Sequence, residues 1–399
     1  MYCRILSLLL FVLLPVMLAA QAVVVDSVAG TPLPRASVFD RKGNVVGMSD
    51  DRGRMPYVSP DTYPLTVRYM GYETALVPHP GDLLIKLRES VSELPEVVVT
   101  SDKRQVLRLT GYVREYSSLS TYTDTILLFR EKTVDFMLPL VKARKFDGRP
   151  YQRVLASKSY YRFTDCWGLD SVSDHFGYYF SWSDWIGLID HIDLPEKLRG
   201  REEATDTVYG RYSPAALWRR KNGDVYIDID VLADTTGHVP VLGLSSFTRG
   251  GDMDFAQFTM KYTFTNADDT CVKAEDISRI AMNIETDARG RSMSRLSRID
   301  EPLAVNTYAE IYITDIEYMT VADARRRDKS APRSEDAGIK PPADAPPLQP
   351  AIKEMIERVE RVKHSDRRLA NRPDDRLGSN VHDRKRPNRW LQMLKSILR

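Results

Sequence analysis

Short segments of alternating apolar and polar residues, separated by turns, most constrain how the front of this 399-residue chain can fold. Between Val23 and Glu89 the segments are rich in β-branched residues, and Leu65–Tyr69 shows the two-residue period of a strand with one buried face. Turn residues separate the segments, as in Lys42–Asn44 and Asp51–Gly53. Several strands at this spacing predict a small β-sandwich over residues 23–90.

The first 22 residues predict a cleaved signal peptide. Arg4 precedes an apolar run, Ile5–Ala20, and small residues follow at a cleavage-like exit. The run is shorter than the ~20 apolar residues of a membrane helix, and a retained anchor is the alternative. We therefore expect an exported, periplasmic protein. An oxidising compartment would permit Cys166 and Cys271 to pair, with two small buried residues as the alternative.

The middle of the chain also predicts β-structure. Val225–Val231 and Phe258–Phe264 alternate without a fault, which is typical of antiparallel strands with one solvated face. We expect residues 91–103 to be a connecting strand or linker and residues 104–320 to form a larger β-sheet domain with little helix. Asp228 and Asp230 could act as paired carboxylates in a glycosidase-like cleft, but alternation alone explains them as the wet side of a strand.

The last part of the chain changes character. Prolines and charges over residues 321–350 predict an extended linker. Apolar residues at helical spacing, from Ile352 to Val359, predict an amphipathic helix over residues 351–364. Residues 365–387 are polar and are expected to be mobile, and residues 388–399 predict a second, basic amphipathic helix.

The basic tail is a candidate contact site. Residues 384–399 hold six cations and no acid. Five apolar residues share one face of the predicted helix: Trp390, Leu391, Leu394, Ile397 and Leu398. Such a helix can lie in a membrane interface or contact a partner. The alternative is that it docks into a groove of its own protein.

Four motifs in the N-terminal region resemble a known family. They are Pro32–Val38, Ser49–Gly53, Tyr69–Tyr72 and Leu94–Thr100. In this order they are similar to the carboxypeptidase regulatory-like domain, a transthyretin-like β-sandwich found in bacterial cell-envelope proteins and ahead of TonB-dependent outer-membrane receptors. The chain departs from that family at Arg35, where glycine is usual, and at Met55, where an aromatic residue is usual.

The resemblance implies a fold and a location, not peptidase activity, because the zinc site of metallocarboxypeptidases lies in a separate domain that nothing here resembles. The six histidines show no i, i+4 pair of the metalloprotease type, so we expect no metal and no other cofactor. The chain has 57 Lys and Arg against 55 Asp and Glu, and this balance gives no indication of a nucleic-acid partner.

An aromatic cluster is the main candidate for ligand binding. Tyr179, Trp182 and Trp185 lie among polar residues in a segment expected to be a strand, and flat aromatic faces suit sugars or peptide side chains. Burial in a β core is the alternative. The leading hypothesis is a non-enzymatic interaction or assembly protein of the periplasm, associated with the outer membrane or an outer-membrane partner. The second hypothesis is a glycan-binding or glycan-processing protein that uses this cluster.

Overall fold

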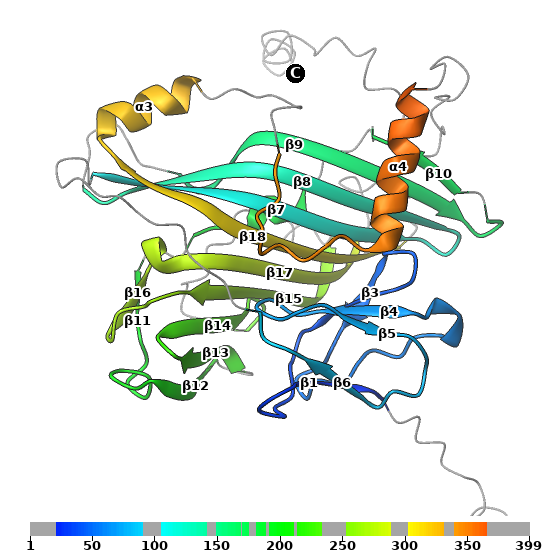
Figure 1. The fold of residues 1–399 in the computed structure, drawn as a ribbon, viewed down its shortest axis with the longest axis horizontal. Helices are drawn as coiled ribbons and strands as arrows, with labels where there is room; N and C mark the ends of the chain where they lie inside the picture. The colour runs from blue at the N-terminus through cyan, green and yellow to red at the C-terminus, as the bar shows by residue number, and fades with distance from the viewer. Residues whose placement is uncertain are drawn as a thin grey trace, which may run out of the picture.

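The computed structural model describes residues 21–90, 105–141, 149–168, 170–174, 181–188, 191–210, 214–233, 253–288, 302–330 and 339–364. The signal peptide, the linker at 91–103, Tyr179 and everything beyond residue 364, including Trp390, Leu391, Leu394, Ile397 and Leu398, lie outside these ranges, and the predictions about them stay predictions. The protein is mainly β, as the sequence predicts, and a ten-stranded antiparallel sheet dominates it (Figure 1).

Residues 22–90 form what we call the N-terminal unit. It contains a four-stranded antiparallel sheet in the order β3-β2-β4-β5 and a parallel pair, β1 with β6. The strands are β1 (Val23–Asp26), β2 (Ser37–Phe39), β3 (Val45–Met48), β4 (Leu65–Arg68), β5 (Ala75–Val77) and β6 (Leu84–Leu87), with a 3-10 turn, η1 (Pro60–Thr62). Val24, Val67 and Ile85 meet in one apolar cluster that includes residues from both small sheets, so this unit has its own core.

The turn after β3 follows from its sequence. The Asp50 carboxylate accepts hydrogen bonds from the backbone N–H groups of Arg52 and Arg54, each at 2.8 Å. Gly53 has a φ of +73°, and a Cβ there would lie 2.6 Å from the Val24 carbonyl oxygen. Only glycine fits this position, because it must adopt a left-handed conformation close to the backbone of β1.

The large sheet is built from two meanders that meet in its centre. The order is β10-β9-β8-β7-β18-β17-β15-β14-β13-β12. Its strands are β7 (Val106–Ser120), β8 (Asp124–Pro139), β9 (Arg149–Asp165), β10 (Asp170–Ser173), β12 (Glu203–Tyr209), β13 (Pro214–Lys221), β14 (Asp224–Asp230), β15 (Met253–Phe264), β17 (Ile277–Ala288) and β18 (Leu303–Met319). The first and last long strands, β7 and β18, therefore pair along the middle.

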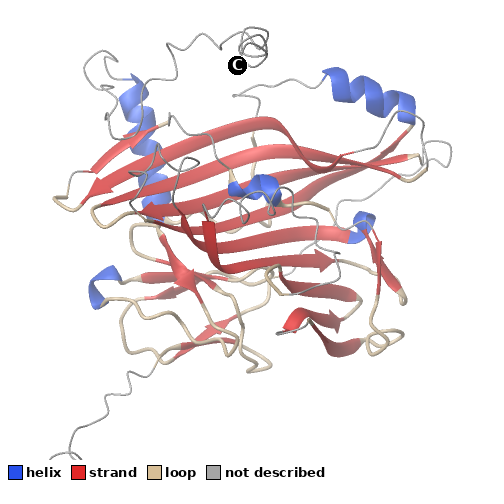
Figure 2. Ribbon diagram, turned by 180° about the vertical axis from the view of Figure 1, so that it is seen from behind, coloured by secondary structure: helices blue, strands red, loops and turns tan. Residues whose placement is uncertain are grey.

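The two faces of this sheet have different neighbours. One, the N-terminal face, carries Tyr116, Lys261 and Glu310 and packs against the N-terminal unit. The opposite face carries the largest apolar cluster. This cluster includes residues of a 3-10 turn, η3 (Trp182–Trp185), which Figure 2 shows lying over this face. It also includes residues of a small antiparallel pair, β11 (His191–Asp193) with β16 (Cys271–Lys273). A further 3-10 turn, η4 (Ala274–Asp276), follows β16.

The prediction that one face of β14 is exposed to solvent is wrong, because the N-terminal unit covers part of that face. Val225, Ile227 and Ile229 are buried on the dry side, as the alternation indicates. On the other side, the Asp228 side chain is only 16% exposed, and its carboxylate accepts a hydrogen bond from the Tyr69 hydroxyl at 3.3 Å. The polar side of β14 therefore faces another unit and not only solvent. The surface of the N-terminal unit that covers it is itself polar, so the alternation is the same in both cases.

In the described part of the chain, two α-helices follow the sheet. Helix α4 (Pro350–His364) coincides with the predicted amphipathic helix, and Ile352, Met355 and Val359 are buried in a cluster with residues of β2, β7 and β8. Helix α3 (Val321–Ser330) corrects the prediction of an extended linker over 321–350. The Thr320 hydroxyl accepts a hydrogen bond from the Asp323 N–H at 3.1 Å, which caps the helix start. Neither helix in the described ranges is long and apolar enough to cross a membrane.

A buried ion pair joins the N-terminal unit to the sheet. Arg68 of β4 and Glu310 of β18 approach to 2.6 Å, and each side chain is 4% exposed. The Arg68 guanidinium donates to the Tyr116 hydroxyl at 2.9 Å, and the Tyr308 hydroxyl donates to Glu310 at 2.8 Å. The guanidinium also lies over both rings. Each member of the pair therefore has a further hydrogen-bond partner, and such partners are the condition under which a buried ion pair is tolerated.

Replacing Arg68 with Ala should destabilise the protein by about 3–5 kcal/mol, because Glu310 would be left buried and unpaired. The free energy of unfolding in urea measures this loss. Asp51→Ala is the control, since it removes the Arg35–Asp51 pair, in which Asp51 is 79% exposed, and should cost less than about 1 kcal/mol. Equal losses for the two variants would contradict the role given to the buried pair.

Candidate functional site

A cleft of about 780 Å³ lies between the N-terminal unit and the half of the sheet that contains β12 to β17. Tyr72, Glu89 and Ser90 of the N-terminal unit line one side. Side chains of β12, β13, β14, β15 and β17 line the other. The volume is within the range of pockets that hold small ligands, and the position, at a junction of two units, is common for such sites.

Four residues on neighbouring strands form the floor of the cleft, and we call them the floor row. They are Arg219, Tyr226, Thr263 and Arg279. The strand register places Arg219 opposite Tyr226, Tyr226 opposite Thr263, and Thr263 opposite Arg279. Since neighbouring strands are about 4.8 Å apart, the row extends over roughly 14 Å of the sheet.

Each arginine of the floor row is held in place by part of its guanidinium group. Arg219 donates from Nη2 to the Tyr69 hydroxyl at 3.3 Å and to Asp228 at 3.5 Å. Arg279 donates to the Ser90 hydroxyl at 3.3 Å and to the Asp344 carboxylate at 2.9 Å. These bonds fix both guanidinium groups relative to the N-terminal unit or the 339–349 segment.

Three polar atoms of the floor row have no hydrogen-bond partner among the residues that the structure describes. They are Nε of Arg219, Nε of Arg279 and the hydroxyl of Thr263, and all three atoms are buried. Arg279 and Thr263 are only 4% and 5% exposed. A buried polar atom without a partner costs about 1–3 kcal/mol, so the fold retains these groups at an energetic cost.

The rim of the cleft contains an ion pair, and the floor contains a protonated tyrosine. Lys221 and Glu89 form an ion pair at 2.6 Å across the rim. Burial, together with the carboxylates of Asp224 and Glu89, raises the pKa of Tyr226 to about 12, so its hydroxyl stays protonated. Burial also raises the pKa of Asp224 above its ordinary value. The cleft therefore offers several hydrogen-bonding groups.

A buried lysine lies beside the cleft, beneath the N-terminal unit. The Lys261 ammonium is 4% exposed, donates to the Pro34 carbonyl at 3.1 Å and lies 3.5 Å from the centre of the Tyr69 ring. Asp228 is 3.8 Å away. Burial lowers the pKa of Lys261 to about 7, although the Asp228 carboxylate opposes the shift.

The free energy of unfolding should rise with pH above about 7, because Lys261 loses its proton more easily in the folded protein than in the unfolded chain. In the unfolded chain its ordinary pKa of 10.5 keeps it protonated, so above pH 7 the unfolded state binds more protons. The rise should continue until the pH passes about 10.5, with a slope of at most about 1.4 kcal/mol per pH unit, and the full cost of burying the charge is present below pH 7. Urea unfolding at several pH values measures the slope, which Lys261→Met should flatten. The exposed control Lys353→Met should leave it unchanged.

On the opposite face, a buried glutamate anchors the segment 181–188. Glu115 of β7 accepts hydrogen bonds from the hydroxyls of Ser181 and Ser183, at 2.7 and 2.5 Å, and from the N–H groups of Trp182 and Ser183, each at 3.2 Å. Burial alone would raise the pKa of Glu115, but neighbouring Arg130 and Lys132 and these hydrogen bonds lower it below its ordinary value. The carboxylate is charged and holds η3 on the sheet.

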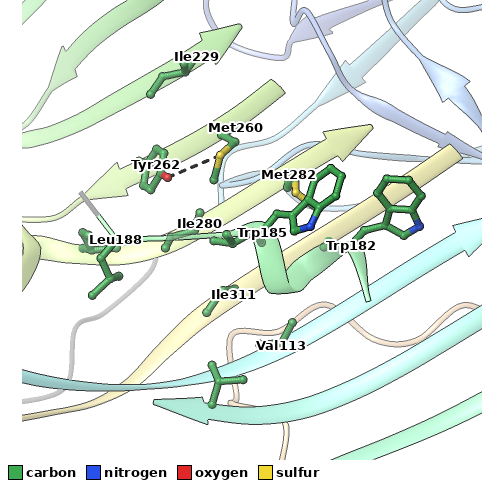
Figure 3. Close-up of a cluster of buried hydrophobic side chains, with 14 of the residues drawn as sticks. Val113, Trp182, Trp185, Leu188, Ile229, Met260, Tyr262, Ile280, Met282 and Ile311 are labelled. Atoms are coloured by element: carbon green, nitrogen blue, oxygen red, sulfur yellow. Dashed lines mark hydrogen bonds between the residues drawn. The ribbon is translucent and has the colours of Figure 1, made fainter. Parts of the chain in front are cut away.

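This anchor corrects the predicted binding face. Trp182 and Trp185 are 1% and 6% exposed, and their rings meet edge to face with centroids 5.2 Å apart. Figure 3 shows them among Met260, Met282 and other apolar side chains of the sheet. The segment forms a 3-10 turn and not the expected strand, so residues three apart point the same way into the core. Tyr179 is outside the described residues.

Glu115→Gln should loosen the 181–188 segment. The variant should lose about 3 kcal/mol of stability, because Arg130 and Lys132 lose their buried carboxylate, and its tryptophan fluorescence should shift to the red as Trp182 and Trp185 meet water. Thermal unfolding and emission spectra provide the two measurements. Glu354→Gln, at an exposed position of α4, should change neither. A native emission spectrum for the Glu115→Gln variant would contradict the anchoring role.

The other candidate reactive groups are separate or already engaged. Cys166 is exposed and Cys271 is buried, and both thiols are free, so the two do not pair. Asp230 accepts a hydrogen bond from the Leu232 N–H at 3.0 Å, while Asp228 is held by Arg219 and Tyr69. Within the described ranges, no three or more His, Cys, Asp or Glu side chains gather in a way that could hold a metal ion.

No motif in the sequence marks Arg219, Thr263 or Arg279 as site residues. The alternation of Phe258–Phe264 assigns Thr263 to the polar side of a strand, and that signal is correct. It could not show that a second unit covers this side, nor which residues of β14 and β17 lie beside Thr263. Both facts depend on strand register, which alternation alone leaves open.

No family model and no curated protein matches this chain. Among solved structures, one described as "lipid-protein interactions in lipovitellin" matches with 9% identity and a TM-score of 0.26. The match covers 55% of this chain and 26% of that one, so the chain spans about a quarter of its length. A likeness at this level carries no argument about fold or function.

Proposed function

We propose that this chain is a non-enzymatic interaction protein of the bacterial cell envelope, whose ligand or partner binds in the cleft between the N-terminal unit and the sheet. The observation that carries the proposal is the cleft itself, a space of about 780 Å³ at the junction of two units, whose floor arginines are held in place by hydrogen bonds to Tyr69 and Asp344. Side chains that are held before a ligand arrives lose little conformational entropy when it binds, and such pre-organised pockets are typical of binding sites.

The envelope location is supported by the predicted signal peptide over residues 1–22 and by the motifs similar to the carboxypeptidase regulatory-like domain. In this proposal the N-terminal unit is a transthyretin-like sandwich, and its two small sheets around one core agree with that fold. Its task is to provide one wall of the cleft. The basic tail, residues 388–399, would attach the protein to a membrane surface or to an outer-membrane partner.

The absence of enzymatic activity is part of the proposal. The cations at the floor and rim of the cleft are paired with carboxylates, as Arg279 is with Asp344, Lys221 with Glu89 and Arg219 with Asp228. A general acid or base needs a proton that it can exchange with a substrate near neutral pH. Carboxylates that hold arginines in place suit positioning and recognition better than proton transfer.

The full chain should co-sediment with cell-envelope fragments of the producing bacterium through the cleft. Thr205 is exposed, lines the cleft and lies opposite Arg219, so Thr205→Trp fills the cleft without removing a buried contact. We expect it to weaken co-sedimentation about tenfold, the effect of losing roughly 1.4 kcal/mol of binding free energy.

Val208→Trp is the matched control for this experiment. Val208 is 43% exposed on the same strand, β12, and is not among the residues that line the cleft. It should bind as the wild-type chain does. Equal binding by both tryptophan variants would place the site elsewhere. If the wild-type chain stays in the supernatant while the fragments sediment, the proposed function is wrong.

A further inference from the structure

Two hairpin turns at one end of the large sheet hold exposed aromatic side chains, and we call these turns, residues 121–123 and 166–168, the aromatic tips. Tyr122 lies between β7 and β8 and is 85% exposed, and Trp167 lies between β9 and β10 and is 84% exposed. The register of β8 with β9 places Asp124 opposite Asp165, so the two tips are neighbours (Figure 1). The other tryptophans of the described ranges are at most 6% exposed: Trp182, Trp185 and Trp218.

Hydrogen bonds within each turn hold the backbone of the aromatic tips. The Thr121 hydroxyl accepts a hydrogen bond from the Asp124 N–H at 3.1 Å. The Asp165 carboxylate accepts one from the Trp167 N–H at 3.0 Å, and Gly168 follows with a φ of +88°. Each ring is therefore exposed on an ordered backbone, so moving it out of water would cost little further conformational entropy.

The shape and the residue types of the aromatic tips favour a lipid surface over a protein partner. A stable protein interface buries roughly 800 Å² on each side, which requires a continuous face. Beside the tips lies instead a cavity of about 310 Å³, lined mainly by polar and charged residues of the tips and of the N-terminal unit. Trp and Tyr are enriched at the boundary between head groups and acyl chains, because each joins an apolar ring to one polar group. Fluid lipid can close around two protruding rings without a matching surface.

The charges near the aromatic tips indicate which lipids suit them. Four acids line the neighbouring cavity, Asp40, Asp61, Asp124 and Asp165, and two cations do, Arg41 and Lys42. Because the acids outnumber the cations, this end of the sheet does not attract anionic head groups. The contact would depend on the rings and favour zwitterionic lipid, whereas the basic tail, with six cations and no acid, would favour anionic lipid.

Helix α4 connects the aromatic tips to the tail. Its Arg358 forms an ion pair at 2.8 Å with Asp170, which begins β10 directly after the second tip. Residues 365–387 separate the end of α4 from the predicted tail helix, and a chain of that length spans up to about 75 Å when extended. The tips and the tail can therefore reach one surface together, and two weak contacts on one surface reinforce each other.

We infer that the aromatic tips insert into the head-group region of a zwitterionic lipid surface, with Tyr122 and Trp167 as the inserted residues. The inference does not depend on the cleft, which lies against strands β12 to β17 in the other half of the sheet. It adds a second membrane contact to the one proposed for the tail.

The first test uses the full chain with Trp390→Phe, so that Trp167 is the one remaining exposed tryptophan among the five of the sequence. Vesicles of phosphatidylcholine should shift its fluorescence emission to the blue, because the indole ring leaves water. Phosphatidylcholine brominated on its acyl chains should quench the emission. An unchanged spectrum with both lipids would overturn the inference.

Three serine variants test the rings one at a time. Trp167→Ser and Tyr122→Ser should each weaken co-sedimentation of the chain with phosphatidylcholine vesicles about tenfold, because one aromatic ring no longer leaves water. Tyr209→Ser is the matched control, since Tyr209 is 73% exposed on β12, at the opposite edge of the sheet. It should bind as the wild-type chain does. Equal binding by all three variants would contradict the role of the tips.

Further outcomes separate the aromatic tips from the tail and from the cleft. A chain with Trp390, Leu394 and Ile397 replaced by Ser should bind anionic phosphatidylglycerol vesicles less well but keep the blue shift of Trp167 on phosphatidylcholine. Loss of that shift would assign the contact to the tail and overturn the inference. Sedimentation with envelope fragments but with neither kind of vesicle would indicate a protein partner and overturn it as well. Thr205→Trp should leave vesicle binding unchanged, so the cleft and the tips can fail independently.

Discussion

The ion pair between Arg68 and Glu310 is the interaction on which the arrangement of the protein depends. It lies under the N-terminal unit, away from water, and each member also has a tyrosine hydroxyl as a hydrogen-bond partner. Two charges taken from water need close to ideal geometry to recover their desolvation cost. Any other placement of β4 over the sheet would leave both charges unpaired, so the pair defines one relative position of the two units.

The cleft follows from that position. With β4 fixed over β18, the N-terminal unit extends across β17 and β15, covers Lys261 and ends with Tyr72 and Glu89 facing β13. The part of the sheet face under this unit becomes an interface, and the floor row lies at its edge, next to the cleft. A rigid wall on each side means that little conformational entropy is lost when a ligand enters.

Sequence patterns predict where the strands lie and which side of each is apolar. They do not predict which part of the protein covers the polar side. The alternation in Val225–Val231 correctly separates the buried side of β14 from its polar side, and the spacing of Ile352 to Val359 correctly predicts the buried stripe of α4. The same patterns cannot show what covers a polar side, because solvent and a polar partner surface select similar residues. The tryptophans of η3 were expected on a strand since nothing local signals that Glu115, far away in sequence, would anchor a 3-10 turn there.

The seam between β7 and β18 sets the order in which the sheet can be completed. β7 is made early in synthesis and β18 late, and each is the inner edge of its own meander until the two meet. A chain that leaves a ribosome or a translocation pore therefore exposes a long, unpaired strand edge while almost two hundred further residues emerge, and such edges readily pair with other chains. Protection of that edge during biogenesis, by slow release or by a holding chaperone, is the requirement that this topology imposes on any cell that makes the protein.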